Sequence, residues 1–456
     1  MCDIALLSHS YLAKLDMAEM GEITPRISIA TIAGYLRSKN VDVKVITNKG
    51  IGHIIKEVGS YRPKIIGLPA FTTEIHDAAE IAKEVKRFFP EAIIVVGGPH
   101  PSALPRETLL EFPVFDIAIK GEGEEVLLEL LSDRKLEDIK GIAYKEGNDV
   151  LLTPQKERLK TLDILPIPAF DLFDLDYYRK NNNGKLLLML ESSRGCPFNC
   201  NFCYRIVGRN VILKSPHRIV DELEFIIKKY VPDSIVFENG IFVTNRSYSL
   251  MVCEEITKKK LKLPHIEVES TSHMLKDIDF VRELKKVGIC SANFGIESGN
   301  ENILKKVGKG QSLEQIKEAV AVCKQVGIKI YGFSILGHPY ETRKTIYDTI
   351  KFTRKLELDG MNYAIMVPFP GTEVRAMAEQ GLGGYKILSN DWRLYGKQSG
   401  KVLELEQIPR DMLVKLQMLA YLHWLFYKPK RIVKFIKDYF KWDIVVWIIR
   451  RLLKSE

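Results

Sequence analysis

Short apolar runs alternate with amphipathic segments through the first 140 residues. The segments near 28–39, 51–59, 76–88, 105–111 and 123–132 have the spacing of helices. The runs that predict strands are Ile4–Leu7, Val41–Ile46, Lys64–Leu68, Ala92–Val96 and Asp116–Ile119. This alternation is typical of parallel strands joined by helical crossovers. It therefore predicts a doubly wound, Rossmann-like α/β domain over residues 1–140.

A second alternation begins at residue 185, after a looser connector over 141–184 that holds a hairpin-like segment and two prolines. Helical patterns lie at 216–230, 246–260, 277–287, 312–326 and 342–357. The predicted strands are Leu186–Leu190, Ser234–Phe237, His265–Val268, Ala292–Gly295, Ile328–Leu336 and Asn362–Val367. Six strand–helix units are too few for a closed eightfold barrel. We therefore expect a partial barrel over 185–400, followed by a helical region over 401–456.

Composition suits an intracellular globular protein. The 456 residues are 46% hydrophobic, and no stretch reaches the roughly 20 apolar residues of a membrane span. The N-terminus lacks the basic start of a signal peptide. Three of the seven cysteines lie within eight residues, which indicates a ligand set rather than disulfides. A reducing cytoplasm is the expected location.

The net charge of +9 is concentrated at the C-terminal end, where residues 428–456 hold nine Lys and Arg against three acidic residues. No nucleic-acid motif surrounds these charges, so we expect no nucleic-acid partner. Three of the four tryptophans, Trp424, Trp442 and Trp447, lie in or beside this tail. A basic amphipathic helix with tryptophans can bind an anionic membrane peripherally, which would hint at a lipid-like substrate. The interpretation that we favour is that the tail packs across the open side of the barrel, with its lysines in solvent.

The candidate chemistry lies in the segment Ser193-Arg-Gly-Cys-Pro-Phe-Asn-Cys-Asn-Phe-Cys-Tyr204. Cys196, Cys200 and Cys203 form a C-x3-C-x2-C group that can hold three corners of a 4Fe–4S cluster. A missing fourth cysteine leaves one iron open to chelate a small molecule. The alternative is a zinc site or a group of buried thiols. Zinc requires a fourth ligand, and the nearest histidine, His217, lies in a different segment.

This spacing, with Gly-Cys-Pro and Phe-Cys neighbours, resembles the signature of the radical S-adenosylmethionine (SAM) enzymes. The resemblance implies that the open iron binds SAM and that an electron from the cluster cleaves it to a 5′-deoxyadenosyl radical. It also implies a reducing partner such as flavodoxin or ferredoxin. The cysteine loop follows the first predicted barrel strand, which is the catalytic end of such a barrel.

Four later segments resemble SAM-binding elements of the family: 238–240, 295–299, 332–341 and 368–372. The third resembles a segment that lines the adenine, and the fourth resembles the loop that closes the adenine pocket. Glu238-Asn-Gly is an altered form of a turn that contacts the SAM amine. Glu297 lies in Gly-Ile-Glu-Ser-Gly, where a carboxylate could bind the ribose or the amino group or simply cover the strand end. One departure is Glu269-Ser-Thr-Ser-His273, where many relatives have an arginine. The residues that the resemblance places on SAM are Phe202, Glu238, Asn239, Glu297, Ser298, Ile335 and Pro368.

The first half carries a second resemblance, to the cobalamin-binding domain fused to many radical SAM enzymes. Ligands of doubly wound sheets lie at the carboxyl ends of the strands, and glycines there let a flat corrin approach the backbone. A nucleotide is the alternative ligand, although no G-x-G-x-x-G follows the first strand. The residues that the resemblance places on cobalamin are Thr72, Thr73, Gly97, Gly98, His100, Gly121, Glu122 and Gly123. The D-x-H-x-x-G pattern is absent, so we expect neither His9 nor His76 on cobalt.

The two resemblances together predict a cobalamin-dependent radical SAM enzyme acting on a small-molecule or lipid-like substrate. The reaction they imply is methyl transfer. One SAM methylates cobalamin, a second SAM yields the radical that abstracts a substrate hydrogen, and the substrate radical takes the methyl group. An oxidative cyclase with the same cofactors and a binding protein without turnover are the alternatives. A methylthiotransferase is disfavoured, because the first half lacks a second cysteine triad.

Overall fold

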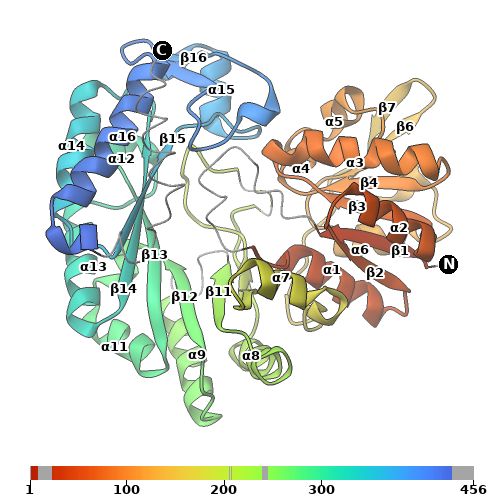
Figure 1. Ribbon diagram of the computed structural model, residues 1–456, viewed down its shortest axis with the longest axis horizontal. Coiled ribbons are helices and arrows are strands. Elements are labelled where there is room, and N and C mark those ends of the chain that lie inside the picture. The colour runs from red at the N-terminus through yellow and green to blue at the C-terminus, as the bar shows by residue number, and fades with distance from the viewer. Residues whose placement is uncertain (1, 9–22, 205, 207, 239–244, 434–456) are drawn as a thin grey trace.

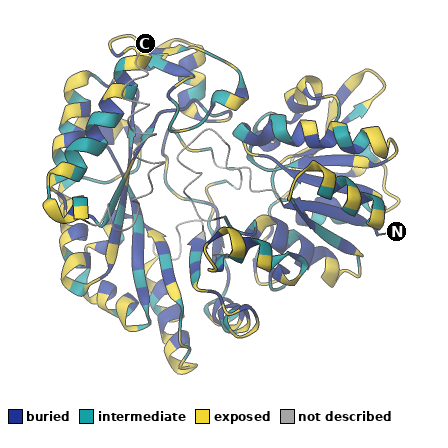
Figure 2. Cartoon of the chain, in the orientation of Figure 1, coloured by how far each residue is buried: buried dark blue, intermediate teal, exposed yellow. Residues whose placement is uncertain are grey.

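Two sheets, each flanked by helices, organise the chain (Figure 1). The computed structural model describes residues 2–8, 23–204, 206, 208–238 and 245–433. The first sheet has seven strands and the second has six. Most strand residues are buried or half-buried, while the helices show an exposed outer face (Figure 2). This is the division that strand–helix alternation predicts.

The first sheet has the order β2-β1-β3-β4-β5-β6-β7, and its first five strands are parallel. These strands are β1 (Ile4–Ser8), β2 (Val43–Thr47), β3 (Ile65–Pro69), β4 (Ile93–Gly97) and β5 (Ile117–Ile119). The helices are α1 (Ile27–Ser38), α2 (Ile51–Tyr61), α3 (Ile75–Phe88), α4 (Pro99–Ala103), α5 (Pro105–Glu111) and α6 (Glu124–Leu130). An order of 2-1-3-4-5 is flavodoxin-like and places the ligand crevice near the switch point between β1 and β3. The predicted doubly wound domain is confirmed.

The hairpin that the sequence placed in the connector extends this sheet. Strands β6 (Ile142–Glu146) and β7 (Asp149–Leu152) form it, and β6 pairs antiparallel with β5. The short β5 would otherwise leave an open edge, which the hairpin covers. The first sheet therefore runs to Leu152, past the boundary expected at residue 140. The rest of the connector contains one helix, α7 (Leu175–Asn181).

The second sheet is a partial barrel, as predicted. Its six parallel strands follow chain order from one edge to the other and do not close. They are β8 (Leu187–Glu191), β11 (Ser234–Glu238), β12 (His265–Ser270), β13 (Ile289–Glu297), β14 (Lys329–Leu336) and β15 (Gly360–Ile365). The helices are α8 (Pro216–Tyr230), α9 (Arg246–Lys258), α10 (Ser272–Leu275), α11 (Ile278–Lys286), α12 (Glu301–Val307), α13 (Leu313–Val326) and α14 (Arg343–Lys355).

The C-terminal region packs on the far edge of the partial barrel. It consists of α15 (Glu373–Glu379), β16 (Tyr385–Ile387), β17 (Leu403–Leu405) and α16 (Arg410–Phe426). Gln417 of α16 donates to the carbonyl of Tyr363 in β15 at 2.6 Å. Arg431 lies over the Trp424 ring at 4.4 Å. The tail from residue 434 onward, with Trp442 and Trp447, is outside the described residues. In the part of the chain that is described, no helix has the length and apolar character to cross a membrane.

Candidate functional site

The cysteine loop starts at the carboxyl end of the first barrel strand. A short antiparallel ladder between β9 (Ser193–Arg194) and β10 (Ile212–Leu213) closes its base. Gly195 has φ of +95°, and a Cβ atom there would lie 2.2 Å from the carbonyl oxygen of Asn210. Only glycine fits this turn. The amide of Cys196 donates to the carbonyl of Gly208 at 3.3 Å, so the start and the end of the loop are joined.

The three thiols differ in exposure but lie close enough to interact. Cys203 is exposed, Cys196 is half-buried and Cys200 is buried. Burial raises the pKa of Cys200 to about 12; Lys309 opposes this shift, while Glu297 and the other two thiols add to it. Within the described ranges, no three His, Cys, Asp or Glu side chains form a site for a single metal ion. In a 4Fe–4S cube each thiolate binds its own iron.

Two neighbouring segments hold the loop from outside. The amide of Asn201 donates to the carbonyl of Val307 at 3.1 Å, at the end of α12. The amide of Val374, at the start of α15, donates to the carbonyl of Asn201 at 3.1 Å. Gly371 lies so close to the Tyr204 ring that a Cβ atom would be 2.5 Å from it. The segment 368–372, which the sequence assigned to the adenine pocket, is thus packed on the cysteine loop, and its Pro368 is buried.

Glu297 lies beside the cysteine loop at the end of β13. It is only 6% exposed, and Lys309 donates to its carboxylate at 2.7 Å. Its φ of +62° is unusual for a residue with a side chain, and such strain concentrates at functional sites. The neighbouring Ser298 has a different environment, because its hydroxyl bonds that of Thr349 at 3.1 Å. Of these two predicted SAM residues, Glu297 is the one that the structure brings to Cys200.

The end of β14 lies against the same loop. The Phe202 ring is 5.9 Å from the ring of His338, and Ile335 is half-buried just before it. His338 is fully buried, which lowers its pKa to about 4 and keeps the imidazole neutral. Glu341 accepts hydrogen bonds from the amides of Gly337 at 2.7 Å and His338 at 3.0 Å. Its carboxylate shapes the turn in which predicted adenine contacts lie.

Burial raises the pKa of Glu341 to about 8, outweighing the two amides that lower it, and this predicts a pH-dependent stability. Between about pH 4.5 and 8 the unfolded chain releases this proton before the folded chain does. The free energy of unfolding therefore falls as pH rises through that window. We expect Glu341→Gln to match the wild type near pH 5 and to exceed it above pH 8, on the order of a few kcal/mol. Urea titrations of both proteins at the two pH values test this, and equal curves at high pH would contradict it.

The predicted turn after β11 is only partly within the described residues. Glu238 ends β11 and is paired in register with Glu191 of β8, so its backbone lies at the catalytic end of the barrel. Asn239 lies outside the described residues. The roles of these two residues on SAM remain predictions.

The inner face of the partial-barrel sheet carries polar residues that the sequence did not single out as a site. Ile266 and Val268 of β12 face the helices, so the alternating Glu267 and Glu269 lie on the opposite face of the sheet. Asn293 of β13 donates to Glu267 at 2.6 Å. Burial raises the pKa of Glu269; Glu267 adds to this, and Lys309 and Lys397 oppose it. The sequence signal that could have identified these residues is the pair of glutamates at alternate positions of a predicted strand that follows the cysteine loop.

Predicted cobalamin residues meet at the ends of β3 and β4. Gly98 has φ of +108°, and a Cβ atom there would lie 2.9 Å from the carbonyl oxygen of Ala70. Beside it the His100 ring is 3.4 Å from the Thr72 hydroxyl. His100 is 1% exposed, and burial lowers its pKa to about 4. An added Cβ at Gly97 would make an ordinary van der Waals contact with Ile119, at 3.9 Å, so this position is less crowded than Gly98. Thr73 follows Thr72 and is half-buried.

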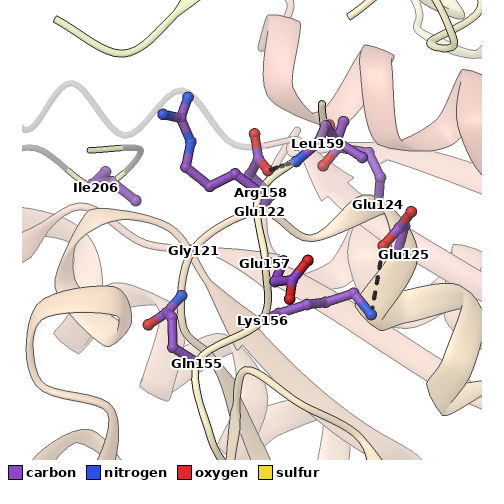
Figure 3. A pocket seen from close by; sticks show the side chains of 10 residues that line it. All are labelled: Gly121, Glu122, Glu124, Glu125, Gln155, Lys156, Glu157, Arg158, Leu159 and Ile206. Atoms are coloured by element: carbon purple, nitrogen blue, oxygen red, sulfur yellow. Dashed lines mark hydrogen bonds and ion pairs between the residues drawn. The ribbon is translucent and has the colours of Figure 1, made fainter. Parts of the chain in front are cut away.

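The segment Gly121–Gly123 lies next to these loops, at the end of β5. The amide of Gly121 donates to the Ser102 hydroxyl at 3.1 Å. Glu122 uses both carboxylate oxygens, one for Arg194 and one for the amide of Leu159, each at 3.0 Å. Figure 3 shows the pocket that these residues border, between the first domain, the connector and Ile206 of the cysteine loop. The glutamate predicted to contact cobalamin thus binds the other domain.

Of the two histidines considered as cobalt ligands, the structure describes His76 alone. His76 of α3 lies with its Nε2 atom 3.6 Å from Asp391 and its ring edge-on to Phe112. These contacts suit a packing role. His9 lies outside the described residues.

A buried ion pair at the base of the cysteine loop gives a stability prediction. Lys214 follows β10, its amide donates to the carbonyl of Ser192 at 2.9 Å, and its ammonium binds Glu222 at 2.8 Å. The two side chains are 1% and 0% exposed. We expect Lys214→Met to lower the free energy of unfolding by about 3–5 kcal/mol, because Glu222 loses its partner inside the protein. The double variant with Glu222→Leu should regain most of it in urea titrations; a single variant as stable as wild type would contradict this.

Comparisons with known proteins agree with both halves of the chain. The model of the radical SAM superfamily matches residues 190–353, and the model of the B12 binding domain matches residues 13–131. The anaerobic magnesium-protoporphyrin IX monomethyl ester cyclase of Rubrivivax gelatinosus is 27% identical over 78% of this chain and 67% of its own. The structure of OxsB, a cobalamin-dependent radical enzyme with aqua-cobalamin and SAM bound, has a TM-score of 0.75 at 19% identity. That likeness covers 92% of this chain and 66% of OxsB, and it shows the fold.

The uncharacterized methyltransferase PH0819 of Pyrococcus horikoshii is 30% identical to the chain over 445 residues, 95% of each protein. Similarity at this level over nearly the whole of both proteins shows the family. This chain is a radical SAM enzyme with a cobalamin-binding domain, of the class B methyltransferase-like family, and its cofactors are a 4Fe–4S cluster, SAM and cobalamin.

Proposed function

We propose that the enzyme methylates an unactivated carbon of a small-molecule substrate. The observation that carries this proposal is the ion pair between Glu122 and Arg194, at 3.0 Å. It joins the loop after β5 to the residue that precedes the cysteine loop. The two candidate cofactor sites therefore open on one seam, where a single substrate can meet both.

The cofactors supply the radical and methyl chemistry when bound, and the residues of the chain position them. We assign Cys196, Cys200 and Cys203 to the cluster. Lys309 keeps Glu297 in place beside the loop for the polar groups of SAM. Tyr204 packed on Gly371 closes the loop against segment 368–372 and restricts access of water. The remaining residues proposed for SAM are Phe202, Glu238, Asn239, Ser298, Ile335 and Pro368.

On the other side of the seam we assign the strand-end loops of the first domain to cobalamin. Their position at the carboxyl ends of β3, β4 and β5, where doubly wound sheets bind ligands, supports this role. Residues proposed there are Thr72, Thr73, Gly97, Gly98, His100, Gly121, Glu122 and Gly123. Two of them would act indirectly: His100 by packing on Trp392, with ring centres 5.1 Å apart, and Glu122 through Arg194.

We place the substrate against the inner face of the partial-barrel sheet, between these two groups. Asn293 bonds Glu267 there at 2.6 Å, and Glu269 interacts with Lys309, which also contacts Glu297. Carboxylate and amide groups on this face can hydrogen-bond polar atoms of a substrate. We propose a polar or hydroxyl-bearing substrate over a purely apolar one. A lipid-like substrate with peripheral membrane contact depends on the tail beyond residue 433.

Oxidative cyclisation is the second candidate, because the Rubrivivax protein named as a cyclase is 27% identical to this chain. We further propose that a small electron-transfer protein such as flavodoxin or ferredoxin reduces the cluster. We propose that the enzyme works in the reducing cytoplasm, because its seven cysteines form no disulfide.

The test begins with protein purified anaerobically with cobalamin supplied. About four irons and one corrin per chain are expected from spectra and mass spectrometry. Incubation with SAM, a reductant and candidate substrates should then give both 5′-deoxyadenosine and S-adenosylhomocysteine. 5′-Deoxyadenosine without S-adenosylhomocysteine would favour the cyclase. Iron without corrin would overturn the methyltransferase proposal.

A further inference from the structure

A buried arginine joins the two domains one residue before the turn of the cysteine loop. The Arg194 side chain is 8% exposed. Its Nε atom lies 3.0 Å from both carboxylate oxygens of Glu191. Its Nη1 atom donates to Glu122 at 3.0 Å, and its Nη2 atom donates to Glu124 at 2.6 Å. Every nitrogen of the guanidinium therefore faces a carboxylate.

The three carboxylates come from two domains. Glu191 ends β8 of the partial barrel, whereas Glu122 lies in the loop after β5 and Glu124 is the first residue of α6. The side chains of Glu122 and Glu124 are 13% and 4% exposed. A planar guanidinium can bind several carboxylates in fixed directions, which a lysine cannot do. The arrangement therefore fixes the orientation of this loop relative to β8.

The connector ties the same junction to both ends of the cysteine loop. Arg158 donates to the carbonyl of Asn210 at 2.6 Å and to the carbonyl of Arg194 at 3.3 Å. One of these carbonyls precedes the loop and the other follows it. The next residue, Leu159, donates its amide to Glu122 at 3.0 Å, the contact drawn in Figure 3. Movement of the loop 121–124 must therefore displace the base of the cysteine loop.

We propose that Arg194, Glu122 and Glu124 form a latch through which cobalamin binding orders the cysteine loop. The alternation in Gly121-Glu-Gly-Glu124 explains how one short loop serves both sites. Its glycines are among the residues proposed for cobalamin, and its two carboxylates hold Arg194. Arg194 is then a positioning residue for the cluster. This inference rests on the proposed cobalamin site at Gly121 and Gly123.

The charges of the latch set the expected order of variant effects. One guanidinium balances three buried carboxylates, and removing it would leave all three without this partner. Removing one carboxylate charge from the first domain leaves Arg194 paired with the others. Arg194→Met should therefore disturb the loop most, and Glu122→Gln or Glu124→Gln should do so less. The glutamate variants are the cleaner probes, because they leave the barrel sequence intact.

The experiment measures backbone hydrogen exchange in the full-length protein with its cluster reconstituted, with and without hydroxocobalamin. In the wild type we expect the corrin to slow exchange about tenfold in segments 190–204 and 208–215. In the Glu124→Gln variant, hydroxocobalamin should still bind but should slow exchange in these segments much less. If Glu124→Gln fails to fold, Glu124→Asp, which keeps the charge but shortens the side chain, should show the same reduced response.

The matched control is Glu111→Gln, which removes the carboxylate charge at another contact across the seam, the 2.9 Å bond that Trp392 donates. It should keep the full exchange response. A latch variant that binds corrin and responds as the wild type does would overturn the latch. A wild-type protein that takes up no corrin would instead overturn the proposed function, and the coupling with it. The two failures are therefore distinguishable.

Discussion

Replacing Cys200 with alanine is expected to remove iron from the protein and to abolish reductive SAM cleavage. Cys200 is the buried member of the triad. It lies between the turn at Gly195 and Asn201, whose backbone is hydrogen-bonded to Val307 and Val374. Two thiolates that remain cannot retain a cube that needs three protein ligands and one open iron. The result should be a loss of nearly all iron and sulfide and of 5′-deoxyadenosine formation, at least 10³-fold, since the radical has no other source.

Cys290→Ala is the matched control for this loss. Like Cys200, Cys290 forms no disulfide, and it is half-buried. It lies in β13, where its thiol donates to the carbonyl of Gly288 at 3.1 Å. This variant should keep about four irons per chain. The measurement is iron and sulfide content together with 5′-deoxyadenosine after reduction with dithionite. Full iron content in Cys200→Ala, or an equal loss in Cys290→Ala, would contradict the assigned ligands.

The overall fold could be predicted because its strands and helices are locally encoded. Helix α8 starts at Pro216, where the missing amide is tolerated, and buries Ile219, Leu223 and Ile226 along one face. Such periodicity is visible in the sequence alone. The partner of β5 was not visible, because strand pairing depends on which edge is left open in three dimensions. That is why the hairpin 142–152 was placed in the connector.

The same distinction between local and long-range signals applies to the candidate site. The cysteine triad and the glycines with positive φ are short-range signals, so they could be read from spacing and residue type. The role of Glu122 could not, because its partner Arg194 is 72 residues away and its carboxylate would suit either a cofactor or an ion pair. Ser298 shows the same limit. Its place next to Glu297 suggested a ligand contact, whereas its hydroxyl bonds Thr349, 51 residues further on.

Gly98→Ala is the second change with a large expected effect, and it should separate the two cofactors. The added Cβ atom would lie 2.9 Å from the Ala70 carbonyl oxygen, and the φ of +108° is strained for alanine. The turn between β4 and α4 must then shift where the corrin is proposed to bind. A cost of about 1–3 kcal/mol in this strained backbone corresponds to roughly a tenfold to hundredfold weaker binding of hydroxocobalamin. Iron content should stay at the wild-type value, because the cysteine loop is on the other domain.

Gly50→Ala is the control that isolates the clash from the backbone strain. Gly50 has nearly the same φ, +110°, but an added Cβ atom there would meet nothing within 4 Å. Both variants carry the strain of a positive φ, whereas only Gly98→Ala crowds a strand end. Titration with hydroxocobalamin, followed by visible absorption, should therefore show weakened binding for Gly98→Ala and wild-type binding for Gly50→Ala. Equal hydroxocobalamin affinities of the two variants would place the corrin away from the β4–α4 turn. Loss of both iron and corrin in Gly98→Ala would mean that the change reaches the cysteine loop through the seam.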